Sequence, residues 1–284
     1  MAQLLSFEEV RGFLGERDKQ SNKGSHGKGL MLAGSEGFSG AAVMACAAAL
    51  RAGIGTLKAL VPQSIPPAFY ALPETMATGL IGAWDAPDLR MLNSFLDACS
   101  CIAAGPGMGG GSGVTTAVLR ALDVKKKIVL DADALNALSH TSAFPRVLHS
   151  EVVLTPHPGE MARLTGKSVE QILAVPEQTA LEYATAWGCT VLLKSAVSYI
   201  AAPDGRAYRN ETGNAGLAKG GSGDVLTGIV LAFLGQGLKP FEAACAAAYV
   251  LGTSADRAME LLKERMLLSR DVTEAVSKTL EHFF

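Results

Sequence analysis

A glycine-rich segment that ends in an aspartate is the part of the sequence best suited to phosphate chemistry. Gly220-Gly221-Ser222-Gly223-Asp224 precedes the apolar run 225–234, which predicts a buried helix. Where bulky side chains are missing, the backbone N–H groups at the start of a helix can face an anion, with the helix dipole behind them. Gly221, Ser222 and Gly223 are therefore candidates for an anion hole. Asp224 opens the same helix and could take a proton from a substrate hydroxyl.

The plainer interpretation of this segment is a glycine-rich turn in which Asp224 caps the helix. Residues 212–216, with the sequence Thr-Gly-Asn-Ala-Gly, come shortly before it. They make a long glycine-rich approach that a simple turn does not need. We therefore favour the anion-site interpretation.

Other polar residues that could take part in binding or catalysis follow short apolar segments. His157 lies between two prolines, which holds it in an extended turn and favours a pocket role over a buried structural one. Asp131 and Asp133 flank a single residue and could point to opposite sides, one of them toward a magnesium–phosphate cluster. Alternatively, both cap the next helix. Glu160 stands in a predicted first helical turn, where its charge would favour the helix dipole.

The elements that must position these residues are short buried strands. The predicted strands are residues 30–33, 56–61, 101–104, 128–130, 152–154 and 191–193. They alternate with helical stretches such as 40–51, which indicates a mostly parallel sheet covered on both faces. Because ligands of such sheets bind beyond the carboxyl ends of the strands, we expect the motifs to converge in one cleft. Residues 197–201 and 206–208 flank a Pro-Asp-Gly turn and predict a hairpin.

Composition narrows the class of protein. The 284 residues are 49% hydrophobic and 18% charged, with no repeat or linker, so we expect a single domain spanning residues 1–284. The net charge is −2, and the densest basic run, 125–127, is interpreted as a solvated turn, which argues against nucleic-acid binding. The apolar run 41–50 is too short to span a membrane, so no membrane association is expected.

The five cysteines also carry information on the compartment. They are odd in number and scattered through apolar segments, which indicates reduced thiols in the cytoplasm. Cys99 and Cys101 are closely spaced, but no second pair of ligands follows, so we do not expect a zinc site. The sequence assigns no metal ligand.

Longer stretches around these motifs resemble the NAD(P)H-hydrate dehydratase family of the ribokinase-like superfamily. The similar stretches are residues 210–228, which contain the glycine-rich motif, residues 154–164 (Leu-Thr-Pro-His-Pro-Gly-Glu-Met-Ala-Arg-Leu), 130–136 (Leu-Asp-Ala-Asp-Ala-Leu-Asn), 105–109 (Gly-Pro-Gly-Met-Gly), 32–35 and 40–42. They follow the family's order and spacing and cover nearly the whole chain. The resemblance implies a ribokinase-like α/β fold, a three-layer αβα sandwich with a mostly parallel central sheet.

The resemblance also implies a role for each matching residue. Asp224 would be the catalytic base and would contact the substrate, whose pocket would also contain Ala41, Gly107 and His157. The residues expected to contact the adenine nucleotide are Lys194, Ser195, Ala196, Val197, Ser198 and Gly223. Two positions depart from the family pattern: Ser195 stands where glycine is usual, and Asn22 stands where a His-Lys-Gly sequence has its histidine. Ser195 therefore adds a side chain where the backbone would approach the nucleotide.

The implied activity is the ADP-dependent dehydration of the S epimer of NADHX or NADPHX, which regenerates NADH or NADPH. ATP is the alternative nucleotide, and the family further implies Mg²⁺, a homotetramer and an NAD(P)H-hydrate epimerase as a functional partner. In the family's route the base activates the ring hydroxyl, the nucleotide phosphorylates it, and the ring nitrogen expels phosphate.

Two other functions remain open from the sequence. A vitamin-type kinase of the same superfamily, for hydroxyethylthiazole or a pyridoxal-like substrate, would use similar machinery but release a phosphorylated product. The Thr-Pro-His-Pro-Gly-Glu loop disfavours that function. A non-catalytic nucleotide-sensing module is the second alternative, and the presence of Asp224 disfavours it because sensing alone needs no base.

Overall fold

The central feature of the molecule is one large sheet. The computed structural model describes residues 2–260 and 262–284. Within these residues a ten-stranded sheet runs in the order β1-β10-β9-β8-β7-β6-β5-β2-β3-β4. The strands are β1 (Gln3–Leu4), β2 (Lys28–Leu32), β3 (Thr56–Pro62), β4 (Thr75–Leu80), β5 (Cys101–Ala104), β6 (Lys127–Leu130), β7 (Val152–Leu154), β8 (Thr190–Leu193), β9 (Ser198–Ala201) and β10 (Ala207–Asn210).

The sheet is mostly parallel, as the sequence predicts. Only β9 runs against its neighbours, pairing antiparallel with β8 and with β10, whereas the other adjacent pairs are parallel. The predicted hairpin is confirmed, with Ala201 opposite Ala207 across the Pro-Asp-Gly turn. The carboxyl ends of β2, β5, β6, β7 and β8 therefore lie along one edge of the sheet.

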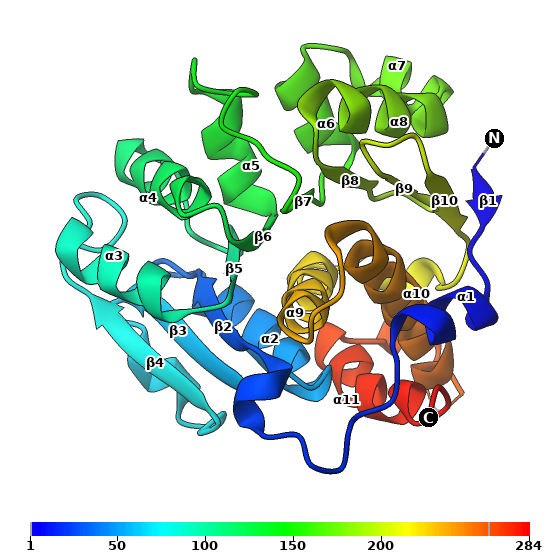
Figure 1. Cartoon of the computed structure of the whole chain (residues 1–284), viewed down its shortest axis with the longest axis horizontal. Helices are drawn as coiled ribbons and strands as arrows, with labels where there is room; N and C mark the ends of the chain where they lie inside the picture. The colour runs from blue at the N-terminus through cyan, green and yellow to red at the C-terminus, as the bar shows by residue number, and fades with distance from the viewer. Residues whose placement is uncertain (1, 261) are drawn as a thin grey trace.

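Helices cover both faces of the sheet (Figure 1). They are α1 (Phe7–Phe13), α2 (Ser39–Arg51), α3 (Leu89–Ala98), α4 (Ser112–Asp123), α5 (Ala132–Ser139), α6 (Pro158–Thr165), α7 (Val169–Ala174), α8 (Pro176–Trp187), α9 (Ser222–Gly235), α10 (Pro240–Ala258) and α11 (Ser269–Leu280), with 3₁₀ turns η1 (Lys23–His26), η2 (Pro66–Phe69), η3 (Ala215–Leu217) and η4 (Glu264–Met266). One layer contains α2, α9, α10 and α11, and the other contains α3, α4, α5, α6 and α8.

Alternation along the strands supplies both core layers. In β2, Met31 packs with the α2–α9–α10 layer, whereas Leu30 and Leu32 pack with the α3–α4–α5 layer. Successive side chains of a strand point to opposite faces, so a strand covered on both faces must be apolar throughout. The three-layer αβα sandwich implied by the resemblance is therefore the observed architecture.

Helix α9 places the glycine-rich motif. Its residues 225–234 are all buried, as expected for a helix that is apolar on every side. A Cβ atom on Gly228 would lie 2.1 Å from the Ala45 carbonyl oxygen, so glycine at this position lets α9 approach α2 closely. This contact fixes the start of α9, and with it Asp224, at the carboxyl edge of the sheet.

The interpretation of Lys125-Lys126-Lys127 as a solvated turn is wrong for two of the three lysines. The Lys126 ammonium donates to three carbonyls at the end of α3, at 2.7–2.8 Å, and Lys127 donates to the Gly237 and Leu238 carbonyls at 2.9 Å. Carbonyls at the end of a helix lack partners within the helix, which is why cations collect there. These lysines tie loops to helix ends.

The helices and the cysteines of the structure can be compared with the expectations from composition. No helix in the described part of the chain is both long enough and apolar enough to cross a bilayer. All five cysteines are free thiols; Cys99 is half-buried and the other four are buried.

Candidate active site

The glycine-rich loop leads into α9 in the geometry predicted for an anion site. Gly221 is the N-cap residue with φ +98°, and no side chain caps the first N–H groups of the helix. At this positive φ any side chain would be strained, and a Cβ atom on Gly221 would also lie 2.7 Å from Met44 Sδ, so glycine suits this position. Ser269 donates from its hydroxyl to the Gly220 carbonyl at 3.0 Å, which anchors the loop to α11. The interpretation of Asp224 as a simple cap is therefore wrong.

Asp224 stands in the first turn of α9 with an unsatisfied carboxylate. It is half-buried, and in the described part of the chain no hydrogen bond reaches its oxygens. Burial, reinforced by the negative charges of Asp131 and Asp133, raises the pKa of Asp224 to about 7. A general base works best when its pKa is close to the operating pH.

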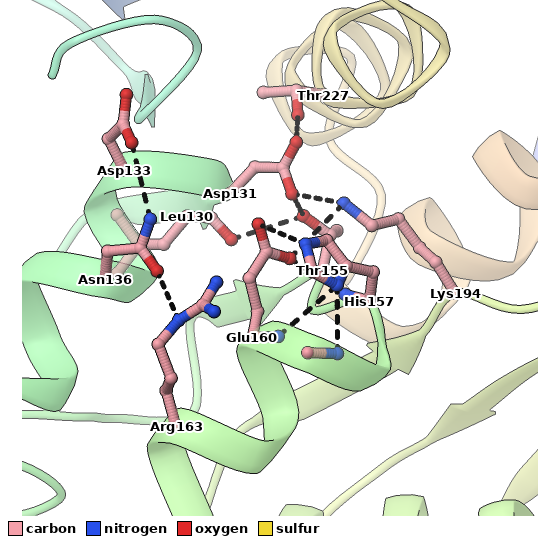
Figure 2. Close-up of polar contacts among 11 residues, drawn as sticks. Leu130, Asp131, Asp133, Asn136, Thr155, His157, Glu160, Arg163, Lys194 and Thr227 are labelled. Atoms are coloured by element: carbon pink, nitrogen blue, oxygen red, sulfur yellow. Dashed lines mark hydrogen bonds and ion pairs between the residues drawn. The ribbon is translucent and has the colours of Figure 1, made fainter. Parts of the chain in front are cut away.

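Asp131 is the centre of the polar network beside this loop (Figure 2). Its carboxylate is almost completely buried and accepts from the Lys194 ammonium at 2.5 Å and the Thr155 hydroxyl at 2.8 Å. The other oxygen accepts from the Thr227 hydroxyl of α9 at 2.9 Å. Residues that follow β6, β7 and β8 are thereby joined to the helix that carries Asp224.

Lys194 remains charged within this network. Burial opposes its charge, but the neighbouring carboxylates, Asp131 foremost, raise the pKa of Lys194 above its usual value. A Cβ atom on Gly223 would lie 3.4 Å from an Asp131 oxygen and 3.5 Å from the Lys194 nitrogen. The ammonium group thus borders the loop whose N–H groups could bind an anion.

His157 has a structural role that the sequence did not reveal. Its Nδ1 accepts from the backbone N–H groups of Gly159 at 3.0 Å and Glu160 at 3.3 Å, so the imidazole is the N-cap of α6. Burial, then the charges of Lys194 and Arg163, lower the pKa of His157. The side chain is nevertheless 50% exposed, so the cap leaves part of the ring open to a ligand.

Glu160 does more than favour the helix dipole. It accepts from the His157 backbone N–H at 2.8 Å, and its other oxygen lies 3.4 Å from His157 Nε2. It also lies 3.8 Å from the Lys194 ammonium. Burial raises the pKa of Glu160 to about 6. His157 and Lys194 are therefore linked through a single buried carboxylate.

Asp131 and Asp133 point apart, as one of the two predictions for them required (Figure 2). Asp133 accepts from the Gly109 backbone N–H at 2.8 Å and from the Asn136 amide at 3.4 Å. Asp131 is the N-cap residue of α5 but makes no side-chain capping bond. The alternative in which both aspartates cap the helix is wrong.

Ala41 and Gly107 come together from different strand ends. Gly107 has φ +62°, and a Cβ atom on it would lie 3.0 Å from the Ala41 side chain and 2.9 Å from the Phe38 carbonyl. Phe38 itself is 63% exposed at this position. The sequence predictions did not include Phe38, although an aromatic residue before a small-residue helix start was visible in the sequence.

The 194–198 segment lies beside the His157 loop. The Lys194 backbone N–H donates to the Pro156 carbonyl at 2.8 Å. The Ser195 hydroxyl donates to the Val197 carbonyl within the same turn, so the extra side chain folds onto its own loop. Ala196 completes this turn, and Ser198 begins β9.

A metal site built by the protein alone does not fit these residues. Across residues 2–260 and 262–284, no group of three or more His, Cys, Asp or Glu side chains is arranged to hold a metal ion. Both oxygens of Asp131 are already engaged by Lys194, Thr155 and Thr227.

Sequence comparisons relate the chain to nucleotide-repair enzymes. The profile of the NAD(P)H-hydrate dehydratase family matches residues 30–278. An ADP-dependent (S)-NAD(P)H-hydrate dehydratase from Neisseria meningitidis is 41% identical over 245 residues, covering 84% of this chain and 80% of that protein. A bifunctional NAD(P)H-hydrate repair enzyme from Moorella thermoacetica is 38% identical over 98% of this chain, which spans only 54% of that relative.

Solved structures give the same relationship. An ADP/ATP-dependent NAD(P)H-hydrate dehydratase from Bacillus subtilis, co-crystallised with ATP and Mg²⁺, superposes with a TM-score of 0.89 at 32% identity, covering 100% of this chain and 99% of that chain. A ribokinase-like superfamily protein from Enterococcus faecalis superposes with a TM-score of 0.88 at 25% identity, covering 99% and 96%.

Proposed function

The chain belongs to the NAD(P)H-hydrate dehydratase family, and from this premise we propose that it uses ADP to dehydrate the S epimer of NADHX and NADPHX. The observation that carries the proposal is Asp224, a carboxylate without a hydrogen-bond partner in the described part of the chain, beside an open helix N-terminus. Its pKa of about 7 suits proton transfer at neutral pH.

The first proposed step is phosphoryl transfer to the substrate's ring hydroxyl. Asp224 takes the hydroxyl proton, the oxygen attacks the β-phosphorus of ADP, and the bond to the bridging oxygen breaks to release AMP. N–H groups of Gly221, Ser222 and Gly223 stabilise the charge on the transferring group. The Lys194 ammonium, held by Asp131 at 2.5 Å, adds a positive charge next to Gly223.

The second proposed step is elimination of the phosphate. Hydroxide is a poor leaving group, whereas phosphate is a good one. The lone pair of the ring nitrogen expels the phosphate, and loss of a proton from the adjacent ring carbon restores the dihydropyridine ring. The net reaction converts NADHX and ADP to NADH, AMP and phosphate, so nucleotide cleavage drives a hydro-lyase reaction.

The proposed binding sites follow the carboxyl edge of the sheet. Ala41, Gly107 and His157, with Asp224, line the pocket for the hydrated nicotinamide. The turn at residues 194–198 and Gly223 contact ADP, or ATP as the alternative nucleotide. Support comes from the close packing of Ala41 against Gly107 and from the bond between Lys194 and the Pro156 carbonyl.

Several broader features of the protein remain proposals. Mg²⁺ would accompany the nucleotide and neutralise its phosphates, held mainly by phosphate oxygens and water. We propose a single domain over residues 1–284, a homotetramer, and an NAD(P)H-hydrate epimerase as functional partner; bifunctional relatives support the last. The free thiols support a cytoplasmic location.

The test is a matrix of nucleotides and substrates. The purified chain is mixed with NADHX or NADPHX and with ADP or ATP, and regenerated NADH or NADPH is read by absorbance while AMP and phosphate are quantified. Stoichiometric NADH, AMP and phosphate support the proposal. Accumulation of a phosphorylated substrate would identify a kinase instead, and nucleotide binding without turnover of any hydroxylated substrate would identify a sensing module.

A further inference from the structure

A hollow of about 560 Å³ lies beside the proposed catalytic residues and has no role in the function described so far. One wall is the glycine-rich loop 109–111 with Ser112 and Thr115 of α4. The other wall is α5, with Asp133, Asn136 and His140. Ligand pockets for small molecules usually have volumes of this order.

The hollow adjoins the catalytic centre through two connections. The Gly109 backbone N–H donates to Asp133 at 2.8 Å, and the charge of Asp133 contributes to the raised pKa of Asp224. Gly107, which packs against Ala41, belongs to the same loop as Gly109. A substrate that reacts at Asp224 and extends along Gly107 would therefore reach this hollow.

The chemistry of its walls suits phosphates and a nucleoside. Helix α4 is 12 residues long, and its N-cap residue Gly111 provides no side-chain cap, so the first N–H groups have no side-chain acceptor there. An anion is favoured at such a helix start. On the opposite wall, His140 Nδ1 is bonded to the Asn136 carbonyl at 2.7 Å, which fixes the ring and leaves Nε2 for a ligand.

Another hollow of the molecule is a poorer candidate for a ligand site. It has a volume of about 290 Å³ and lies between α1, α10 and α11. Its Asp256 carboxylate is already engaged by Gly213 and Asn214, and Arg257 is bonded to the Lys278 carbonyl and His282. Asp256 and Arg257 of this hollow are thus already engaged within the protein, whereas the α4–α5 hollow keeps an uncapped helix start.

We propose that the α4–α5 hollow binds the adenosine-phosphate half of the dinucleotide substrate, with its phosphates at the start of α4 and its nucleoside against α5. This inference rests on the proposed function, because it assumes a substrate with two nucleotide halves. The hydrated nicotinamide ring reacts at Asp224 in the proposed function, so the second half of the substrate must lie further along the same edge of the sheet. Ala41, Gly107 and His157 are assigned to the nicotinamide pocket, so they leave the adenosine-phosphate half without a binding site of its own.

The test compares a dinucleotide with its mononucleotide half in a binding assay. Fluorescence titrations give Kd for NADH and for reduced nicotinamide mononucleotide, with ADP saturating so that the nucleotide site is filled. The wild type is expected to bind NADH at least about tenfold more tightly than the mononucleotide. Neither measurement requires turnover, so a failed dehydration assay would not affect the result.

Ser112→Asp and Ser112→Asn form the critical pair of variants. Both side chains have nearly the same shape, and Asp in a first helical turn stabilises the helix, so misfolding is not expected. Repulsion from Asp should weaken NADH binding about fivefold relative to Asn, with the effect shrinking at high salt. Binding of the mononucleotide should not change.

Gly110→Leu provides a steric test. A Cβ atom on Gly110 meets nothing within 4 Å, so the fold tolerates a side chain that partly fills the hollow. Gly12→Leu, at an equally open position in α1, is the matched control. Only Gly110→Leu should lower the preference for NADH over the mononucleotide. The proposal is overturned if the wild type shows no such preference, or if the Ser112→Asp and Gly110→Leu variants retain it unchanged.

Discussion

The surroundings of Asp224 raise the pKa of its carboxyl group. Asp131, Glu160 and Asp224 lie around one partly buried cation, Lys194, whose nearest partner is Asp131 at 2.5 Å. Several buried carboxylates sharing one positive charge cannot all ionise cheaply. Burial, reinforced by the negative charge of Asp131, raises the pKa of Asp224 to about 7 and that of Glu160 to about 6, although Lys194 opposes both shifts. The residue best placed as a base is therefore also the one that ionises near neutral pH.

Asp224→Asn should remove most of the activity without unfolding the protein. The replacement is nearly isosteric but cannot accept the hydroxyl proton, and loss of a positioned general base costs about 10²–10⁴-fold in rate. Steady-state kinetics with NADHX and calorimetry with ADP make the measurement. Full turnover by a folded, ADP-binding variant would remove Asp224 from its role.

In the wild type, kcat/KM should rise with pH up to about 7, as Asp224 loses its proton.

The same substitution should raise stability, but only at higher pH. Because the folded-state pKa of Asp224 is raised from 3.8 to about 7, the folded protein binds a proton more tightly than the unfolded chain. Wild-type stability therefore falls as pH rises from about 4 to 7, and the deficit persists above that range. The change in pKa corresponds to at most about 4 kcal/mol. Urea unfolding at pH 8 should show Asp224→Asn as the more stable protein, with the advantage absent near pH 4. An equal difference at both pH values would contradict this reasoning.

Phe38 offers a test of the substrate pocket at one side chain. Phe38 is 63% exposed although its backbone packs against Gly107, so its ring is free to stack on a flat ring bound there. Phe38→Ala should raise KM for NADHX by about fivefold or more and leave Kd for ADP unchanged, since stacking of this kind contributes ~1 kcal/mol. Phe284→Ala removes an aromatic ring of similar exposure (59%) at the C-terminus and is the control. Equal effects of the two variants would show that Phe38 has no specific role.

At the scale of elements, local signals predicted most of the fold. The six strands expected from apolar runs are present, and the hairpin after residue 197 forms around its turn. What could not be predicted depends on contacts between distant segments. Thr227 looks like an exception in an apolar helix, yet its partner Asp131 is 96 residues away. Likewise, the ammonium of Lys126 finds its carbonyls at the end of α3 only after the strands have paired.

His157 illustrates how one residue serves both an element and a site. His157 follows β7 and Lys194 follows β8, and 37 residues separate them in the sequence, so no local signal indicates that they are linked. The structure brings their loops together through the Pro156 carbonyl and Glu160. A change at His157 is therefore expected to affect α6 and the surroundings of Lys194 as well as the substrate pocket.

Two substitutions at His157 should separate its capping role from its pocket role. His157→Ala removes the acceptor for two N–H groups and should lower the free energy of unfolding by about 0.5–2 kcal/mol. His157→Asn supplies another good capping oxygen, so stability should be largely retained. If the ring contacts the hydrated cofactor, both variants should raise KM for NADHX to a similar extent. Restoration of wild-type KM by asparagine would mean that the histidine acts only as a cap.

At the scale of the whole molecule, parallel strands gather the site. Asp131 joins the loops after β6, β7 and β8 to the first turns of α9, because these parallel strands end at one edge of the sheet. The helix start, its partner cation and the base therefore have one fixed arrangement. In this arrangement the phosphoryl group can reach the substrate from only one side. The cleft should therefore distinguish between the two orientations of the substrate hydroxyl.

The purified 284-residue chain should consume only the S epimer of NADHX rapidly. NAD(P)H hydrates exist as two epimers at the carbon that bears the hydroxyl, and one cleft can place only one of those hydroxyls between Asp224 and the anion hole. The other epimer directs its oxygen away, and a misplacement of ~1 Å already costs about 10²-fold in rate. Chromatographic separation of the epimers during turnover makes the measurement, and a separate epimerase added at the plateau should release the remainder. The Asp224→Asn variant, with the same epimerase, controls for non-enzymatic loss. Equal initial rates for both epimers would require a cleft that accepts the hydroxyl from either side, which a single base in the first turn of α9 does not provide.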